Sequence, residues 1–502
     1  MKIAVIGSGP AAAAVCLGLL DNHAARGLDI FVYDIGRKVG RLAPELLHRE
    51  PMWEAAEYRS FHKSVLKAGK GWIPEKTHFG DFPEKYGGQT ALNSDMFGGL
   101  SKFWGASFVP FTGADLRDWP IGENELAKYY GKLMRHIRIT GARDKLGDYF
   151  SEQWVNEPPV TVPSAMKRLE RAINDGSDSP FIAGSPRLAL RNSGEAGCTY
   201  CGHCFYGCYN ESIYSSDQTI AELERAGKVR YIAGKRLLRF KAKTGFVELT
   251  LRDTATAVDE LQAFDKVFIA AGCIETSRIV GLSLGIDAFD IVENPMFYVP
   301  IMYTGEWLSG GYDRYLALNN LLIGRLPGAG IDSYVHMQIY PLNLFLWNHA
   351  FYKAAGPLGL KLSRLAQRTI GKHVYMMLFY LHGDYSKGSK LQFAPDSSLL
   401  DFRYRSETAA HAKQAISELS ARLSGTGFHV MTRFMSPFSP GGSYHYAATL
   451  PMNDSRYFRD AGGSIADHVY IADSSTFPSL PAQNHSFSIM ANAYRIAESS
   501  LS

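Results

Sequence analysis

The first 34 residues carry the feature that most constrains the fold. Lys2 to Gly7 reads as a buried strand of a parallel sheet, and an alanine- and leucine-rich helix follows in GSGPAAAAVCLGLLDN. The turn places Gly7, Gly9 and Ala12 in the spacing G-x-G-x-x-G/A, which suits a tight bend, close backbone approach to a pyrophosphate and helix–strand packing. A second strand, IFVYD, ends at Asp34, whose carboxylate can bind a ribose diol. The segment predicts a dinucleotide site without separating NAD from FAD.

Length and composition set the class of protein. The chain has 502 residues, which suggests two or three domains at about 150 residues each. Hydrophobic residues make up 46% and charged residues 20%, which argues against disorder, collagen and coiled coil. The formal net charge is only +4, so neither nucleic acid nor anionic lipid is an expected partner.

No targeting or membrane-spanning segment is expected. The apolar run Ile3 to Ile6 meets glycine at once, unlike the long apolar stretch of a secretory signal. A long segment without formal charge, Ser333 to Tyr352, contains Pro341 and several histidine, asparagine and glutamine residues, which makes it too polar for a transmembrane helix. We therefore expect a cytoplasmic protein.

The C-terminal segment resembles a known family. HVYIADSSTFPSLPAQNHSFSIMANAYRIAESSL reads as a strand over His468–Ala472, a turn with Asp473, and a final helix from about Ser486. Here the chain resembles the glucose-methanol-choline (GMC) family of flavin-dependent oxidoreductases, and DWPIGENELAKYY is similar to its sugar-oxidising branch. Further similarity lies in FGGLSKFWGAS, VFIAAGCIETSRI and SKGSKLQF, so that the resemblance runs through the whole chain.

This resemblance implies FAD as the cofactor. The N-terminus of the final helix would point at the flavin, where free N–H groups stabilise the charge of the reduced ring. Phe103 stands where one branch of the family has a histidine that bonds to the flavin, so we expect non-covalent FAD. Besides Gly7, Gly9, Ala12 and Asp34, the implied cofactor residues are Gly98, Gly99, Ser101, Trp104, Ala271, Gly272, Asp473 and Ser486.

Two segments near the C-terminus supply candidate catalytic residues. Alcohol oxidation needs a base for the hydroxyl proton, and family members place a histidine about forty residues before a histidine or asparagine. His445 in GGSYHYAATLPM is the expected base, and Asn484 in PAQNHSFS would hold the substrate oxygen. His485 replaces the proline common in relatives, so the second role stays open between Asn484 and His485. His336 and the remaining histidines have no comparable motif and are expected to be core or surface residues.

Four cysteines form a compact cluster. Cys198, Cys201, Cys204 and Cys208 have the spacing C-x2-C-x2-C-x3-C of bacterial ferredoxins, without the final proline. The spacing favours an iron–sulfur cluster of the 3Fe-4S or 4Fe-4S type. A structural zinc site and disulfides or free thiols are the alternatives.

The motifs together predict an α/β protein with a Rossmann-like FAD-binding domain and a substrate domain built on an antiparallel sheet flanked by helices. The resemblance implies an FAD-dependent alcohol dehydrogenase that oxidises a hydroxyl of a sugar, glycoside or polyol and passes electrons through the iron–sulfur cluster to a redox protein or quinone. An oxygen-using oxidase with a structural cysteine cluster and a non-catalytic electron-transfer flavoprotein are the alternatives. The FAD-binding domain is expected over residues 1–45, 90–110, 195–295 and 440–502, and the substrate domain over 46–89, 111–194 and 296–439.

Overall fold

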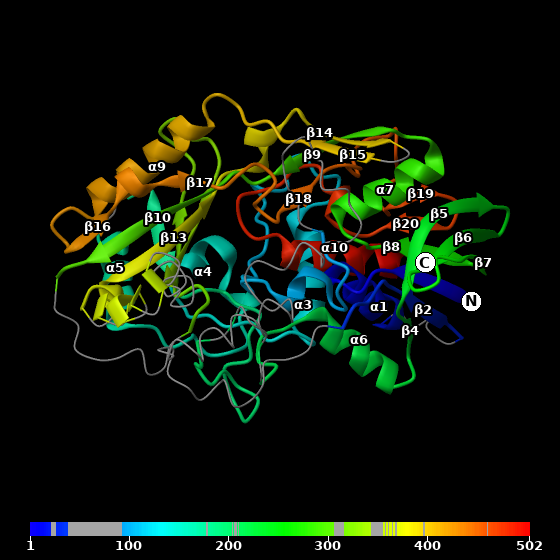
Figure 1. Cartoon of the computed structure of the whole chain (residues 1–502), viewed down its shortest axis with the longest axis horizontal. Coiled ribbons are helices and arrows are strands. Elements are labelled where there is room, and N and C mark those ends of the chain that lie inside the picture. The colour runs from blue at the N-terminus through cyan, green and yellow to red at the C-terminus, as the bar shows by residue number, and fades with distance from the viewer. Residues whose placement is uncertain are drawn as a thin grey trace.

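Four β-sheets and the helices around them make up the part of the chain that the structure describes (Figure 1). The structure is a computed structural model. It describes residues 1–21, 27–38, 93–176, 179–202, 204, 208, 210–305, 316–342, 369–394, 397–458 and 460–501, with 355, 356, 358, 359, 361–363, 365 and 366. The predicted segment 46–89 lies outside this part. Both termini lie at the same end of the molecule.

The N-terminal strand lies inside a six-stranded, mostly parallel sheet. Residues Ile3, Ala4 and Val5 are fully buried, as expected for a strand covered on both faces. Its neighbours on either side are parallel to it, and only the pair at one edge is antiparallel among the described strands. The strands in spatial order are β19 (Ser464–Ala466), β20 (Val469–Ile471), β8 (Lys266–Ile269), β1 (Lys2–Ile6), β2 (Asp29–Tyr33) and β4 (Arg230–Ile232). The strand predicted near the C-terminus thus joins the N-terminal strand through β8.

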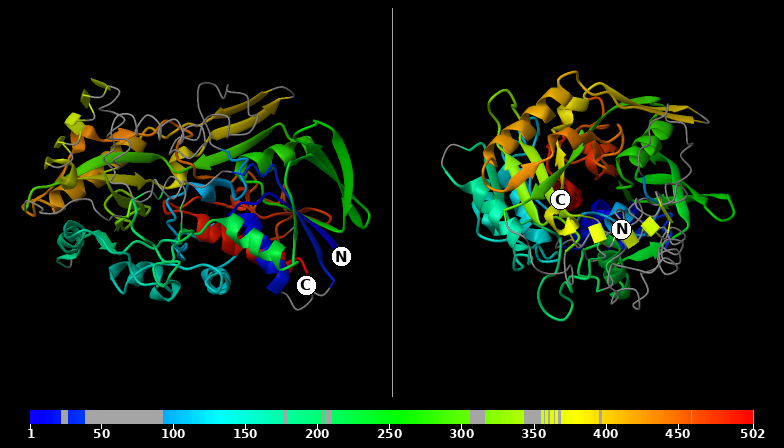
Figure 2. Two further views of the ribbon diagram at one scale, coloured as in Figure 1. Left: turned by 60° about the horizontal axis from the view of Figure 1, so that its bottom comes forward. Right: turned by 60° about the vertical axis from the view of Figure 1, so that its left-hand side comes forward.

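Two helices from opposite ends of the chain pack against each other beside this sheet. They are α1 (Pro10–Asp21) and α10 (Ser486–Ser499), shown in blue and red in Figure 2. Their contact is close because α1 contains small residues, namely four alanines and Gly18. A Cβ atom at Gly18 would lie only 2.6 Å from the carbonyl oxygen of Tyr494. The glycine therefore allows the two backbones to approach.

The second large sheet is antiparallel. Its strands are β16 (Phe428–Val430), β10 (Met296–Tyr303), β13 (Val374–Tyr380), β12 (Val335–Pro341), β11 (Leu321–Arg325) and β3 (Phe181–Gly184), with β17 (Ser436–Pro437) beside β10. Side chains alternate between its faces, as the pleat requires. Met337 and Met377 share one hydrophobic core with Leu169 of α5 (Ser164–Asn174) and Ile416 of α9 (Thr408–Arg422). The intervening residues of β12 and β13 face the opposite side.

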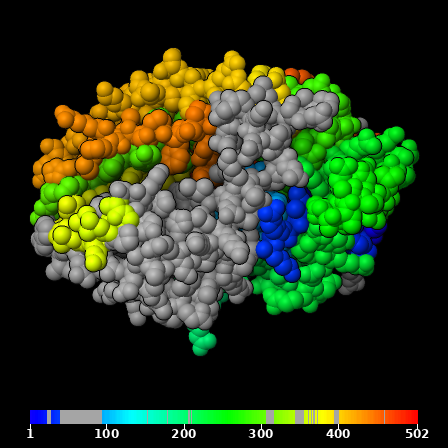
Figure 3. All heavy atoms as spheres, viewed as in Figure 1, coloured from blue at the N-terminus to red at the C-terminus, as the bar shows by residue number. Residues whose placement is uncertain are grey.

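Two smaller sheets and four further α-helices lie in the described part of the chain. One sheet has β15 (Ser397–Asp401), β14 (Ser389–Ala394), β9 (Ala288–Glu293) and β18 (Tyr446–Ala447), and the other has β5 (Lys235–Lys243), β6 (Phe246–Asp253) and β7 (Asp259–Phe264). The helices are α3 (Glu123–Leu133), α4 (Lys145–Phe150), α6 (Ser216–Arg225) and α7 (Cys273–Leu284). The sheet β5–β7 and helix α9 lie at opposite ends of the surface in Figure 3. No helix in the described ranges has the length and apolar character needed to cross a membrane.

The contact between α1 and α10 leads to a stability prediction. We expect Gly18→Ala to lower the free energy of unfolding by about 1–3 kcal/mol, because the new methyl group must displace the backbone of α10. Gly131, within α3, is the matched control, since a Cβ there would lie 3.9 Å from the ring of Trp154. Gly131→Ala should be neutral or stabilising by up to about 1 kcal/mol. Equal effects of the two substitutions in urea unfolding would contradict this account of the helix contact.

Candidate active site

A cavity of about 300 Å³ lies between the carboxyl ends of the parallel strands and the antiparallel sheet. The turns that follow β1 and β8 line one part of it. Gln338 and Tyr340 of β12 and Leu378 and Tyr380 of β13 line another. Ligands of open parallel sheets bind at the carboxyl ends of the strands, so the cavity lies where a cofactor is expected.

The β1–α1 turn forms one wall of the cavity. Gly7 has φ +103°, and its N–H donates to the carbonyl oxygen of Tyr33 over 2.8 Å. A Cβ at this position would lie 2.6 Å from the carbonyl oxygen of Ala270, so that only glycine allows the turns after β1 and β8 to meet. Gly9 also lines the cavity, and a Cβ there would meet nothing within 4 Å. Ala12 is fully buried within α1.

Asp34 lies at the end of β2 and lines the same cavity. Its carboxylate accepts hydrogen bonds from the hydroxyls of Ser8 and Tyr231. Burial raises the pKa of Asp34 to about 7, against the opposing effect of these donors. Ser8 also accepts the N–H of Gly98 over 2.9 Å, so it connects the first turn to the glycine-rich loop FGGLSKFWGAS (Phe97–Ser107).

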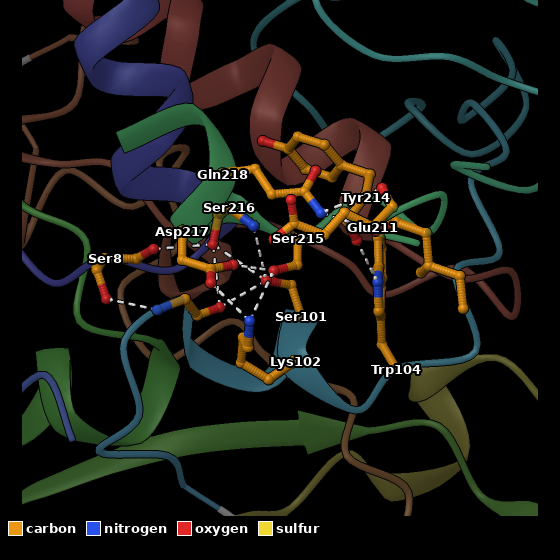
Figure 4. A network of polar contacts seen from close by, with 12 residues as sticks. Ser8, Ser101, Lys102, Trp104, Glu211, Tyr214, Ser215, Ser216, Asp217 and Gln218 are labelled. Carbon is orange, nitrogen blue, oxygen red and sulfur yellow. Dashed lines mark hydrogen bonds and ion pairs between the residues drawn. The ribbon is translucent and has the colours of Figure 1, made fainter. Parts of the chain in front are cut away.

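The glycine-rich loop is held by the N-terminus of α6 (Figure 4). Gly98 and Gly99 both have positive φ, and Gly99 lines the cavity. The Ser101 hydroxyl donates to the carbonyl oxygen of Gly98 over 2.6 Å and accepts the N–H of Ser216 over 3.0 Å. Trp104 lines the cavity and donates its indole N–H to the carbonyl oxygen of Tyr214 over 2.9 Å. The hydroxyl of Ser101 therefore positions the loop.

Asp473 connects the β8–α7 turn to the C-terminal segment. One of its carboxylate oxygens accepts the N–H of Gly272 over 2.9 Å and the hydroxyl of Thr276 over 2.5 Å. The other accepts the N–H of Ser475 over 3.0 Å and the hydroxyl of the same residue. Asp473 and Ala271 line the cavity together with Gly272. Burial raises the pKa of Asp473, and the hydrogen bonds oppose this shift.

Helix α10 begins at the cavity. Its first residue, Ser486, and Ile489 in its first turn both line the wall. The preceding residue, His485, provides no side-chain cap for the helix. The N-terminal N–H groups of α10 therefore bring the positive end of its dipole close to the cavity.

The structure brings the three predicted catalytic residues together. The side-chain nitrogen of Asn484 lies 3.2 Å from Nε2 of His445, although 39 positions separate them in sequence. The His485 ring packs edge-on against that of His445, with 4.7 Å between centroids. Tyr380 stacks on His445 at 5.1 Å. All four residues line the cavity.

Burial keeps the imidazoles of this site neutral. It lowers the pKa of His445 to about 4 and the pKa of His485 well below its usual range, where the neighbouring His445 adds to the effect. A neutral imidazole can accept a proton, so His445 has the protonation state that a general base needs near pH 7.

Sequence reasoning missed three residues of this site. Gln338 donates from its side-chain nitrogen to the amide oxygen of Asn484, and the same nitrogen lies 2.9 Å from Nε2 of His336. The amide oxygen of Asn294 lies 3.1 Å from Nδ1 of His445. His336, expected to be an ordinary core or surface residue, is fully buried next to the candidate catalytic pair. The alternation of polar and apolar residues in VHMQIY was the sequence pattern that could have predicted His336 and Gln338 on one face of a strand.

The described residues give no support for the expected iron–sulfur site. All six cysteines are described, and none is in a disulfide. No group of three or more histidine, cysteine, aspartate or glutamate side chains within the described residues is arranged to hold a metal ion. Cys198 and Cys204 pack against a hydrophobic core, and burial raises the pKa of Cys198 to about 11. Burial also raises the pKa of Cys204, and the nearby Cys198, Cys201 and Cys208 add to this shift. The thiols thus lie near one another, but no arrangement that could hold a metal is found among the described residues, so the iron–sulfur prediction is not supported.

Comparison with known proteins identifies the fold. The sequence matches no protein-family model and no curated protein. Among solved structures it is similar to pyridoxine 4-oxidase from Mesorbium loti, with a TM-score of 0.59 and 12% identity over 99% of this chain and 98% of the other. It is also similar to a fungal aryl-alcohol oxidase, with a TM-score of 0.56 and 13% identity over 99% of this chain and 98% of the other. The chain therefore has the fold of these two enzymes along its whole length.

The buried neutral histidines predict how stability depends on pH. Burial lowers the pKa of His336 to about 3, whereas a histidine in the unfolded chain titrates near 6.5. The unfolded chain thus binds the proton first, and stability falls as pH decreases from about 6.5 toward 3. His336→Gln lacks this contribution. Below pH 6.5, the slope of its unfolding free energy against pH should therefore be smaller than the wild-type slope by about 1.4 kcal/mol per pH unit. Parallel pH dependences of variant and wild type in urea titrations would contradict burial of a neutral His336.

Proposed function

We propose that the protein is an FAD-dependent oxidoreductase of the GMC type that oxidises an alcohol to a carbonyl compound. The observation that carries the proposal is one cavity that joins the Gly7–Gly9 turn and Asp34 to the pair His445 and Asn484. A dinucleotide site alone would fit many proteins. The neutral imidazole and the amide at its other end add the groups that alcohol oxidation requires.

The residues present fit FAD. Gly9 leaves room for a pyrophosphate beside the N-terminus of α1, and Asp34 offers a carboxylate for a ribose diol. The N-terminus of α10 would stabilise negative charge on the ring at the opposite end of the cavity. Phe103 in the cavity wall supports the expectation that FAD is held without a covalent bond at this position. When bound, FAD supplies the acceptor for two electrons and the hydrogen that leaves the substrate carbon.

His445 and Asn484 would act on the substrate hydroxyl. Nε2 of His445 accepts the hydroxyl proton, and the amide N–H of Asn484 donates to the substrate oxygen as it becomes more negative. The loop that carries His445 is held by the buried Glu293, which accepts the N–H of Gly441 over 2.6 Å and the hydroxyl of Ser443 over 2.8 Å. The pair of His445 and Asn484 argues against a non-catalytic electron-transfer flavoprotein.

The lining near His445 bears on the class of substrate. Met296, Leu378, Tyr340 and Tyr380 border the cavity on the side of the antiparallel sheet. These side chains favour an alcohol with an aromatic or apolar body over one with many hydroxyl groups. The two structures of the same fold are named for pyridoxine and aryl alcohols, which agrees with this choice. The sugar, glycoside or polyol expected from the sequence stays a prediction.

A second candidate concerns the electron acceptor. The sequence favoured a dehydrogenase that passes electrons through a cysteine-bound cluster, but the described cysteines form no metal site. Both solved structures compared above are oxidases by name. These observations favour an oxygen-using oxidase over a cluster-linked dehydrogenase. A redox protein or quinone as acceptor and a cytoplasmic location stay predictions.

The catalytic proposal predicts alcohol-dependent reduction of bound flavin. Mixed anaerobically with an aryl-methanol such as benzyl alcohol, the purified holoprotein should lose its flavin absorbance. His445→Ala should slow this reduction by roughly 10²–10⁴-fold, the usual contribution of a general base. His429→Ala is the matched control, because His429 lies on β16 and outside the cavity wall. Equal rates for the two variants in stopped-flow absorbance would refute the role of His445.

The acceptor proposal predicts hydrogen peroxide as a product. In air, the holoprotein should form about one peroxide for each carbonyl formed, since two electrons leave the alcohol and two reduce oxygen. Metal analysis of the anaerobically purified protein should find no stoichiometric iron or acid-labile sulfide. Iron and sulfide in stoichiometric amounts, with no peroxide during turnover, would instead restore the dehydrogenase.

A further inference from the structure

A chain of hydrogen bonds between side chains runs through the catalytic pair and continues beyond it on both sides. It passes from Tyr340 through Gln338, Asn484 and His445 to Asn294. Asn294 is fully buried, and Gln338 is 1% exposed. Each amide in this chain can face either way in principle, and the neutral imidazole can carry its proton on either nitrogen. The contacts that determine the amide orientations and the tautomer of His445 therefore also determine whether His445 can act as a base.

The contacts of Asn294 determine which group donates and which accepts in each hydrogen bond of this chain. The side-chain nitrogen of Asn294 contacts the carbonyl oxygens of Leu381 and Pro481 at 3.0 Å each, and that of Leu480 at 3.4 Å. A carbonyl oxygen can only accept, so the NH2 group of Asn294 must face these residues and its oxygen must face His445. Turning the amide over would place its oxygen against three carbonyl oxygens in a buried site.

The remaining directions follow from this one. The oxygen of Asn294 requires a proton on Nδ1 of His445, so Nε2 of the neutral ring carries a lone pair. Asn484 then donates to Nε2, and its own oxygen accepts from Gln338. The oxygen of Gln338 in turn accepts the hydroxyl of Tyr340 over 2.6 Å. Each hydrogen bond of the chain thus joins a donor to an acceptor.

We infer that Asn294 and Gln338 are positioning residues that fix the direction of these hydrogen bonds. Nε2 of His445 then carries the lone pair and Asn484 turns its NH2 group to the same side, so that a substrate hydroxyl can displace the Asn484–His445 bond, donate to Nε2 and accept from Asn484. The inference deepens the proposed function and rests on it for its catalytic meaning. Asn294 selects the tautomer of His445, and Gln338 selects the orientation of Asn484. Neither residue need touch the substrate.

Gln338→Glu offers a nearly isosteric reversal at one end of the chain. A glutamate carboxylate cannot donate, so Asn484 should turn over and point its oxygen at Nε2 of His445. Asn294 still requires a proton on Nδ1, so the ring should gain a second proton and become an imidazolium. Gln338→Met is the matched control, because it removes the hydrogen bonds of Gln338 without imposing the opposite direction.

The test is ¹⁵N NMR of holoprotein labelled at histidine, with the His445 signals identified by their loss in His445→Gln. Wild type and Gln338→Met should both show a protonated Nδ1 and an unprotonated Nε2 at neutral pH, whereas Gln338→Glu should show both nitrogens protonated. Asn294→Leu should lose the preference for Nδ1 protonation. An Nε2-protonated His445 in the wild type, or an unchanged His445 in folded Gln338→Glu, would overturn the inference.

Kinetics on the same variants separate this inference from the proposed function. Gln338→Glu should lower the rate of flavin reduction by roughly 10²-fold or more at saturating alcohol, and by more than Gln338→Met, because it removes the base lone pair. The NMR pattern does not depend on turnover. The expected tautomers without any alcohol oxidation would refute the proposed function and leave the direction of the chain standing.

Discussion

The approach of two backbone turns is the constraint on which the rest of the structure depends. The carbonyl oxygen of Ala270 occupies the space that a side chain on Gly7 would need. The contact brings the turns after β1 and β8 together, and Asp473 adds the turn after β20 through its hydrogen bonds to Gly272 and Thr276. Helix α10 follows from this last segment, so its N-terminus reaches the same cavity as the first glycine turn. Residues from both ends of the chain thereby build one site.

The antiparallel sheet supplies the other half of the site through its pleat. On β12, Met337 packs into the core shared with α5 and α9, while Gln338 faces the cavity. The cost of burying these polar side chains is offset because Gln338, Asn484 and His445 bond to one another. Burial thus serves the chemistry in two ways, since it keeps the imidazole neutral and makes the direction of each hydrogen bond hard to reverse.

The sequence allowed much of the framework to be predicted, because local patterns determine it. The strand, glycine turn and helix at the N-terminus and the start of the last helix at Ser486 depend on neighbouring residues. The mixed α/β character is confirmed. The structure also places His445 and Asn484, the residues that the family resemblance assigned to one catalytic pair, within hydrogen-bond distance.

Other parts of the site depend on long-range contacts that no local pattern contains. Asn294 acquires its role from the carbonyl oxygens of Leu381 and Pro481, which lie 87 and 187 positions further along the chain. The cysteine spacing predicted an iron–sulfur site, but the geometry that four thiols need to hold a metal depends on irregular backbone such as that of Tyr200, which has φ +55°. Spacing alone cannot specify such a conformation.

The most direct test of the central claim is an experimental structure of the protein purified with its own chromophore. The account predicts FAD in the cavity, with its pyrophosphate beside Gly9 at the start of α1 and its ring system between the N-terminus of α10 and His445. A nicotinamide dinucleotide in that place, or FAD with its ring system remote from His445 and Asn484, would contradict it.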